Sequence, residues 1–275
     1  MGRGESFRAT SRMGDYSFII ERGKVDYSNV VYKKTALSQV IVRLDFSEYV
    51  ESEKLFVSSI SDVIQMSFPK KSMQQLIRFQ TMKFTFDSNG AKSDKSQEEG
   101  IQQEYMDSVG NKLIISNKFL IMEVNLYSSY EELMNKLAPI IRMVLSTSGK
   151  TIIRTGIRYI NIYNESSIKP QKNFFTVPVS ALVESKTVSE SQCIRMMSLS
   201  EYNLDDLRLN FRYGQYNPNY PQPIKHPSFV LDFDCFCELL LSDYNRIMEH
   251  IKAAHDEIQR FFEDSITDSL RKVMG

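Results

Sequence analysis

Two stretches of this chain follow one plan, a β-strand that leads within a few residues into an amphipathic helix. They are FLIMEVNLYSSYEELMNKL at 119–137 and FVLDFDCFCELLLSDYNRI at 229–247. In each, an apolar strand segment gives way to hydrophobic residues at helical spacing. Helices that pack on one face of an antiparallel sheet are typical of α+β proteins. The repetition predicts a degenerate internal duplication, in which each half supplies a meander and a helix that covers it.

Period-two alternation of hydrophobic residues marks the remaining strands. The signal is strongest at 151–163, which is rich in β-branched and aromatic residues. The predicted strands lie near 40–46, 76–86, 101–106, 113–126, 151–163, 174–185, 190–200, 206–216 and 228–236. The predicted helices span 52–66, a segment that starts after Ser129, 239–262 and 264–274. We therefore expect an α+β fold with antiparallel meander sheets, each covered by amphipathic helices, and a long C-terminal helix.

The composition along the chain suggests three regions. Residues 1–30 mix Gly, Ser, Arg and Asp with one short apolar island, which predicts a flexible N-terminal arm. Residues 31–165 form a first α+β half, in which the polar tract 88–100 predicts a mobile loop. Residues 166–275 form a second half, a β-meander with the C-terminal helix. We expect the two halves to pack as one unit.

Charge and cysteine content exclude several classes of protein. The 34 basic and 34 acidic side chains leave a net charge of zero, so nucleic-acid binding is not favoured and no polybasic membrane anchor is present. Three cysteines do not make a disulfide framework in a chain of 275 residues, which favours a reducing compartment. No apolar run reaches the length of a membrane span, roughly 18 residues. The sequence thus predicts a soluble, cytoplasmic protein.

The segment Ser-Gly-Lys-Thr at 148–151 resembles the end of a phosphate-binding loop. Such a loop needs a glycine five residues before Gly149, where this chain has Val144. It also needs a strand before it and a helix after it, and here that order is reversed. The segment therefore predicts a helix C-terminus that Gly149 closes.

Histidine and cysteine do not form a convincing metal site. His250 and His255 stand five residues apart, about 140° around a helix, whereas two ligands of one metal need a spacing of three or four. Cys235 and Cys237 lack further thiol or imidazole partners and are interpreted as buried thiols. His255 lies on the apolar stripe of its helix, which predicts a half-buried imidazole bonded to a neighbouring strand or loop. We predict no metal, no cofactor and no catalytic residue.

Four arginines form the strongest candidate for a binding site. They occur as pairs on two predicted strands, and each pair points to one face because strand side chains alternate. If the strands share a sheet, the guanidinium groups form a surface suited to carboxylate or phosphate. Alternatively, they pair with Asp205, Asp206, Asp232 and Asp234, which gives a self-neutralising face. The four candidate residues are Arg154, Arg158, Arg208 and Arg212.

Two motifs resemble a known group of proteins. The run RTGIRYIN at 154–161 matches R-x-G-[IL]-R-Y-x-N, and Ala254-His255-Asp256 followed by Phe262 and Ile266-Thr267 matches A-H-D…F…I-T. Together they resemble a sporadically distributed family of uncharacterised prokaryotic proteins of about 250 residues. The similarity extends from about Tyr32 onward. The matching positions are Arg154, Gly156, Arg158, Asn161, His255 and Asp256.

This resemblance carries no enzymatic assignment over to the chain. The family's patchy distribution is similar to that of mobile or anti-phage defence genes, whose products often act with a partner encoded beside them. Gly156 would allow a close approach of the backbone, and the Asn161 amide would hold a neighbouring strand.

These observations favour a non-catalytic cytoplasmic interaction protein over an enzyme. We expect it to act as a homo-oligomer or through a neighbour-encoded protein, by way of its sheet edges and its arm. The alternative is an enzyme or sensor that binds a phosphorylated small molecule or a nucleic-acid end through the arginine-lined face.

Overall fold

The computed structural model describes residues 27, 30, 32–87, 90–181, 194–223, 225–226 and 228–275, with no side chains for 81–96. Apart from Tyr27 and Val30, the predicted arm at 1–30 therefore lies outside the described residues.

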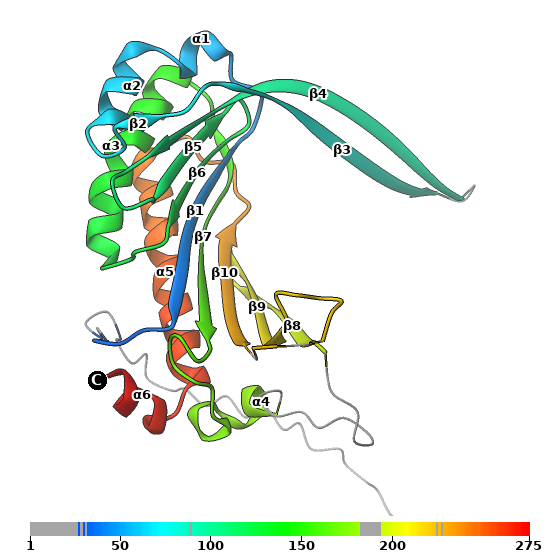
Figure 1. Ribbon diagram of the computed structural model, residues 1–275. Helices are drawn as coiled ribbons and strands as arrows, with labels where there is room; N and C mark the ends of the chain where they lie inside the picture. Colours follow the sequence, from blue (N-terminus) through cyan, green and yellow to red (C-terminus); the bar gives the residue numbers. More distant parts are fainter. Residues whose placement is uncertain are drawn as a thin grey trace, which may run out of the picture.

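The fold is α+β, as the sequence predicts, and it contains one antiparallel sheet of ten strands. The strands are β1 (Leu37–Phe46), β2 (Lys70–Lys71), β3 (Gln75–Asp87), β4 (Gly90–Met106), β5 (Lys112–Ser116), β6 (Phe119–Val124), β7 (Ile152–Tyr163), β8 (Met196–Leu204), β9 (Leu207–Tyr216) and β10 (Ser228–Cys237). The helices are α1 (Ser52–Leu55), α2 (Ser58–Gln65), α3 (Tyr130–Ser148), the 3-10 turn η1 (Lys172–Phe174), α4 (Val177–Ser180), α5 (Tyr244–Ser265) and α6 (Asp268–Met274). The long helices α3 and α5 lie on the same face of the sheet (Figure 1).

The two sides of the sheet have equivalent topologies about its centre. It runs β2-β4-β5-β6-β1-β7-β10-β9-β8, with β3 paired to β4 alone. Strands β1 and β7 pair at the middle, and outward from each lies a three-stranded meander whose last strand leads into α3 or α5. The two look-alike stretches are β6–α3 and β10–α5, which occupy equivalent places. The two predicted meanders therefore join into a single sheet, and β7 opens the second repeat of the topology.

The core fills the space between the sheet and these two helices. On β1 every second side chain is buried, from Val40 to Phe46. Leu137 and Ile141 of α3 and Ile251 of α5 are also buried and belong to the same cluster. Burying each such side chain contributes about 1.5–3 kcal/mol relative to exposure, which fixes the helices on this face.

Side chains cap both helices where the chain leaves the sheet. The Ser129 hydroxyl accepts a hydrogen bond from the backbone N–H of Glu132, and the Asp243 carboxylate accepts one from Arg246. Each cap satisfies a backbone donor that would otherwise lack a partner. At the other end of α3, Gly149 adopts a left-handed conformation with φ of 63°, and its N–H bonds the Leu145 carbonyl. The predicted closure of this helix by Gly149 is confirmed.

Four predicted elements differ from the structure. The strand predicted at 113–126 is divided into β5 and β6. The polar tract 88–100 belongs largely to β4, which begins at Gly90 and pairs with β3 as far as Gln102. A two-stranded ribbon needs no apolar face to form its backbone hydrogen bonds. The strand predicted at 174–185 lies outside the described residues from 182 on. Its described part contains the end of η1 and α4, whose first turn includes a proline that could not donate a hydrogen bond in a strand. The helix predicted at 52–66 is broken into α1 and α2.

The last helix returns to the start of the sheet. The backbone N–H of Lys34 bonds the carbonyl of Met274 at 2.9 Å, so the entry to β1 and the end of α6 meet. None of the helices in the described part of the chain is both long and apolar enough to cross a membrane.

Candidate functional site

Strand β7 carries the candidate residues on its two opposite faces. Arg154, Gly156 and Arg158 point to the face that the helices leave open, whereas Tyr159 and Asn161 point toward α5. The alternation follows from the extended backbone. Two regions are therefore considered, the open face of the sheet and a pocket beneath α5.

On the open face, a buried carboxylate binds two of the arginines. The Asp232 side chain is 7% exposed and accepts two hydrogen bonds from Arg158, both at 2.7 Å. Arg212 approaches the same carboxylate at 3.5 Å. The hydrogen bonds to Asp232 raise the pKa of Arg158 above its ordinary value.

The third arginine of this network lies between two further acids. Arg154 is 3.6 Å from Asp234 and 3.9 Å from Asp45, and its guanidinium lies 4.3 Å from the centre of the Phe236 ring. Burial raises the pKa of Asp234, although the neighbouring arginines oppose the shift. Arg154, Arg158 and Arg212 are thus brought together with acids from β1 and β10.

Arg208 lies opposite Phe236 in the sheet, and its acidic partner differs from those of the other three arginines. It pairs with Glu238 at 3.1 Å, and its side chain is 66% exposed. Asp232 and Asp234 are among the acids that the sequence suggested as partners, whereas Asp45 and Glu238 were missed because strand pairing and the course of the chain after β10 were unknown. Binding of an anion by the four arginines stays a prediction.

Gly156 permits the close packing of β7 against β10. A Cβ atom at this position would lie 2.6 Å from Cβ of Phe236 and 2.8 Å from the carbonyl oxygen of Cys235. The expected close backbone approach is therefore present, and the neighbour is the strand that carries Asp232 and Asp234.

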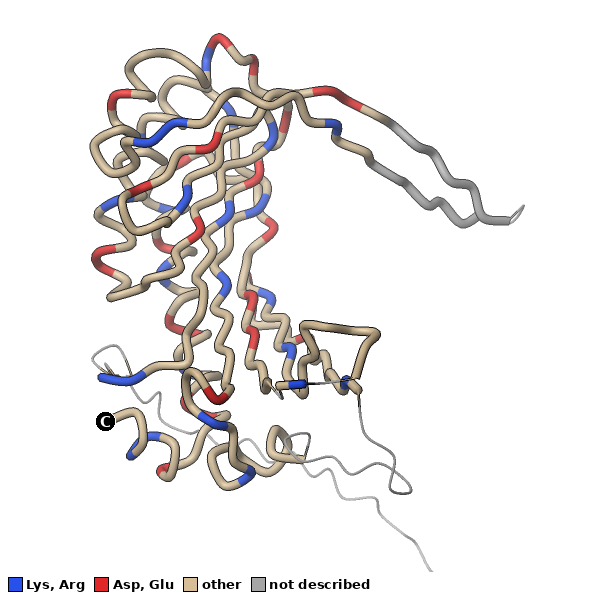
Figure 2. The backbone as a smooth tube through the Cα atoms, viewed as in Figure 1, with Lys and Arg blue, Asp and Glu red and all other residues tan. Residues whose placement is uncertain are grey.

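Apolar side chains run diagonally across the same open face. Ile114 of β5 lies opposite Ile121 of β6, while Ile41 of β1 and Ile160 and Ile162 of β7 continue the diagonal toward β10. All five, here called the isoleucine stripe, are only partly buried. Acidic and basic residues are interspersed along the same central strands (Figure 2). The open face thus combines an apolar stripe with a neutralised charge network.

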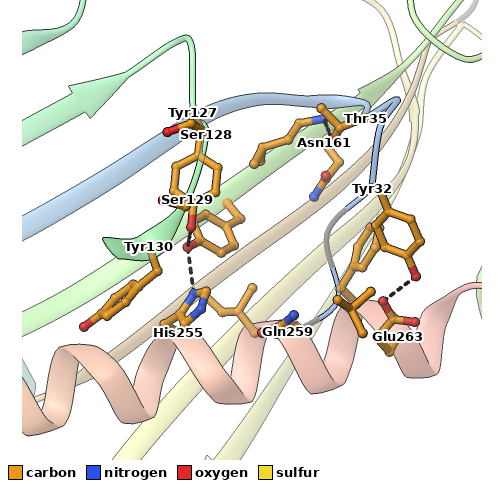
Figure 3. A pocket seen from close by; sticks show the side chains of 15 residues that line it. Tyr32, Thr35, Tyr127, Ser128, Ser129, Tyr130, Asn161, His255, Gln259 and Glu263 are labelled. Carbon is orange, nitrogen blue, oxygen red and sulfur yellow. Dashed lines mark hydrogen bonds between the residues drawn. The ribbon is translucent and has the colours of Figure 1, made fainter. Parts of the chain in front are cut away.

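The opposite face of β7 borders a pocket of about 220 Å³ beneath α5 (Figure 3). Its walls come from the segment before β1, the β6–α3 connection, β7 and α5. The lining residues are Val30, Tyr32, Thr35, Leu37, Tyr127, Ser128, Ser129, Tyr130, Tyr159, Asn161, His255, Ile258, Gln259, Phe262 and Glu263.

One side of this pocket is a network of tyrosines around His255. The Tyr159 hydroxyl lies 2.7 Å from Nδ1 of His255 and 3.1 Å from the Tyr127 hydroxyl, and the Tyr130 ring stacks on the imidazole at 4.4 Å. Burial lowers the pKa of His255 to about 4, so the imidazole is neutral at pH 7. Burial also raises the pKa of Tyr159 well above its ordinary value, which keeps the phenol protonated.

Polar side chains with backbone or acidic partners form the other side. The NH₂ group of Asn161 donates to the Leu231 carbonyl at 3.3 Å, and the NH₂ group of Gln259 donates to the Tyr27 carbonyl. The Tyr32 hydroxyl donates to Glu263 at 2.7 Å, and Arg271 binds the second carboxylate oxygen at 2.8 Å. Burial and the nearby Glu263 raise the pKa of Tyr32.

The structure brings two of the motif residues together at this pocket. Asn161 and His255 both line it, while Asp256 forms an exposed pair with Lys252. The prediction that His255 is a partly buried imidazole bonded to a neighbouring strand is confirmed. The tyrosines and Gln259 were missed, although Gln259 follows His255 by one helical turn and so shares its face.

Among the described residues, no group of three or more His, Cys, Asp or Glu side chains is placed to hold a metal ion. Cys235 and Cys237 are buried free thiols, and burial raises the pKa of Cys235 to about 12. No protein-family profile matches this chain, and no curated protein is detectably similar to it.

Proposed function

We propose that this chain is a non-catalytic interaction protein that docks a protein surface, a second copy of itself or a neighbour-encoded partner, on the open face of its sheet. The isoleucine stripe carries the proposal. An antiparallel sheet with one solvated face normally places polar side chains on that face. Here five partly buried isoleucines lie along one diagonal of it, and apolar side chains gathered on an open face are typical of interaction sites.

The charge network beside the stripe supports a protein partner over a phosphate. Arg158 and Arg212 already share the buried Asp232, so an anion would have to compete with a carboxylate held at 2.7 Å. A protein surface needs no free cation, because apolar contacts supply the core of an interface and paired charges its polar rim. Arginine is also enriched where proteins meet.

A double substitution tests this proposal. Replacing Ile41 and Ile160 by lysine places two charges in the stripe without touching the core face. Light scattering of the purified chain would measure self-association, and co-expression with the proteins encoded beside it would measure a heteromeric complex. We expect either complex to weaken at least tenfold, because each lysine must be desolvated at the interface.

Met66→Lys serves as the matched control, since Met66 is 83% exposed at the end of α2. It should leave the complex unchanged. Association of equal strength in wild type and double variant would refute docking on this face, as would a chain that forms no complex in either assay.

A further inference from the structure

The pocket beneath α5 exists because the two halves of the repeat close differently. In the second half, Leu241 stands two residues before the cap of α5, is 3% exposed, and exchanges two backbone hydrogen bonds with Ile152 at the start of β7. In the first half, Tyr127 stands two residues before the cap of α3. There the backbone N–H groups of Asn125 and Leu126 bond the side chain of Asn111 instead. The first connection thus leaves an opening where the second one is sealed.

Aromatic rings dominate the walls of this opening. Five of them come from tyrosine and phenylalanine, namely Tyr32, Tyr127, Tyr130, Tyr159 and Phe262. Tyr127 and Tyr159 have ring centres 5.5 Å apart with a tilt of 58°. Aromatic surfaces of this kind favour offset or edge-to-face contact with another aromatic molecule.

Two carboxamides approach the pocket from opposite sides, Asn161 from β7 and Gln259 from α5 (Figure 3). Each donates its NH₂ group to a backbone carbonyl, which fixes the orientation of the amide. Each NH₂ group keeps a second N–H beside the one that bonds a carbonyl, and within the described residues neither carboxamide oxygen has a hydrogen-bond donor. Both would accept hydrogen bonds from N–H groups of a ligand.

The lining carries no unpaired charge. His255 is neutral, and the carboxylate of Glu263 is bound by the Tyr32 hydroxyl and by Arg271. No lysine or arginine lines the pocket. The lining thus supplies no cation for a phosphate and no free anion for an ammonium ion.

We propose that the pocket binds an uncharged, amino-substituted heteroaromatic molecule of one or two rings, the size of a nucleobase. The ring would pack among the tyrosines, and its amino group and ring N–H would donate to Asn161 and Gln259. The size fits, since an apolar cavity of about 150 Å³ takes benzene and this pocket has about 220 Å³. The site lies on the helix side of β7 and is separate from the proposed protein-docking face.

Calorimetric titration with free adenine and cytosine tests this assignment. We expect saturable binding of at least one of them, with no gain in affinity for adenosine 5′-monophosphate over adenine. Hypoxanthine and uracil, which lack the exocyclic amino group, should bind several-fold more weakly. Chemical-shift changes of the tyrosine and His255 side chains would locate the bound base in the pocket.

Gln259→Leu removes one acceptor and should weaken binding about fivefold, since a neutral hydrogen bond contributes about 1 kcal/mol. Gln65→Leu makes the same change at an exposed position in α2 and should bind as wild type does. Circular dichroism and the unfolding midpoint would show that both variants are folded. No binding of any base at millimolar concentration, binding of tetramethylammonium alone, or equal affinity in wild type and Gln259→Leu would overturn the proposal.

Discussion

At the scale of single residues, the environment of His255 is dominated by burial. The imidazole lies against Tyr130 and Tyr159, and the two charged neighbours, Asp256 and Lys252, act in opposite directions on its pKa. Its helical position in an apolar stripe made the burial predictable. Its partner Tyr159 was not predictable, since the sequence does not say which strand passes beneath α5.

The lowered pKa of His255 makes folding stability depend on pH. The folded value is about 4 against 6.5 for an unperturbed histidine, so the unfolded chain binds more protons between these values. Stability therefore falls as the pH falls through this window. We expect this residue to contribute a loss of about 2 kcal/mol in the free energy of unfolding between pH 8 and pH 5.

His255→Gln isolates that contribution, because the variant keeps every other titrating group. Urea unfolding at the two pH values would measure the difference between wild type and variant. The loss on acidification should be smaller in the variant by about 2 kcal/mol. Equal losses in both chains would show that His255 is freely protonated in the folded state.

Gly156 offers a second prediction at this scale. Alanine there would bring its Cβ within 2.8 Å of the Cys235 carbonyl oxygen, and backbone in a central strand cannot move aside freely. We expect Gly156→Ala to lower the free energy of unfolding by about 1–3 kcal/mol. Ser38→Ala, at an exposed position on β1, should stay within about 0.5 kcal/mol. Denaturant titration measures both, and a neutral Gly156→Ala would mean that β10 can shift.

At the scale of elements, alternation and helical spacing predicted most strands and the helices α3, α5 and α6. Each prediction that was wrong has a physical cause. β4 carries a polar sequence because the outer part of the β3–β4 ribbon pairs only with itself, and no apolar face is required of it. α4 replaces a predicted strand because proline fits the first turn of a helix.

The outer part of this ribbon should be removable. Gln80 and Gln97 are paired directly, so residues 81–96 can be replaced by Asn-Gly, which forms a tight two-residue turn. Figure 1 shows the ribbon projecting away from the body of the sheet. We expect the shortened chain to unfold with a free energy within about 1 kcal/mol of the wild type in urea, because surface changes away from the core have small effects.

A deeper cut provides the comparison for this experiment. Replacing 77–100 also removes Phe79, whose ring contacts Phe119 of β6 at 6.2 Å. That variant should be clearly less stable than the first. If both cuts destabilise the chain equally, the outer ribbon contributes to the fold and the prediction is wrong.

At the scale of the whole molecule, two strand–helix stretches led to the correct fold class. The same comparison could not reveal that the halves join through β1 and β7, because neither strand belongs to the stretches that look alike. The pocket was out of reach for the same reason, since four separate segments of the chain build it. The sequence alone did not decide whether Arg158 pairs with Asp232, because that pairing depends on β10 lying beside β7.

The meeting of Lys34 and Met274 predicts that the order of the halves can be exchanged. Consider a circular permutant that starts at Lys150 and ends at Gly149, with a short Gly-Ser linker joining residue 275 to residue 32. This permutant keeps every strand intact. We expect it to fold with the same circular dichroism spectrum and a single cooperative transition. A permutant opened between Ile157 and Arg158 interrupts β7 and should not fold. Loss of cooperative unfolding in the first chain would contradict the prediction.

The central pairing of β1 with β7 also decides how the chain reaches its fold. Strands of the outer meanders are near neighbours in sequence, so their hairpins close short loops quickly. β1 and β7 are separated by the whole first half of the chain. The chain must therefore lose the conformational entropy of a long loop before these two strands can pair. We expect each meander to form early and the join between them to be the slow step. Until then each half exposes an unpaired strand edge, and during this interval the chain is open to pairing with a second copy.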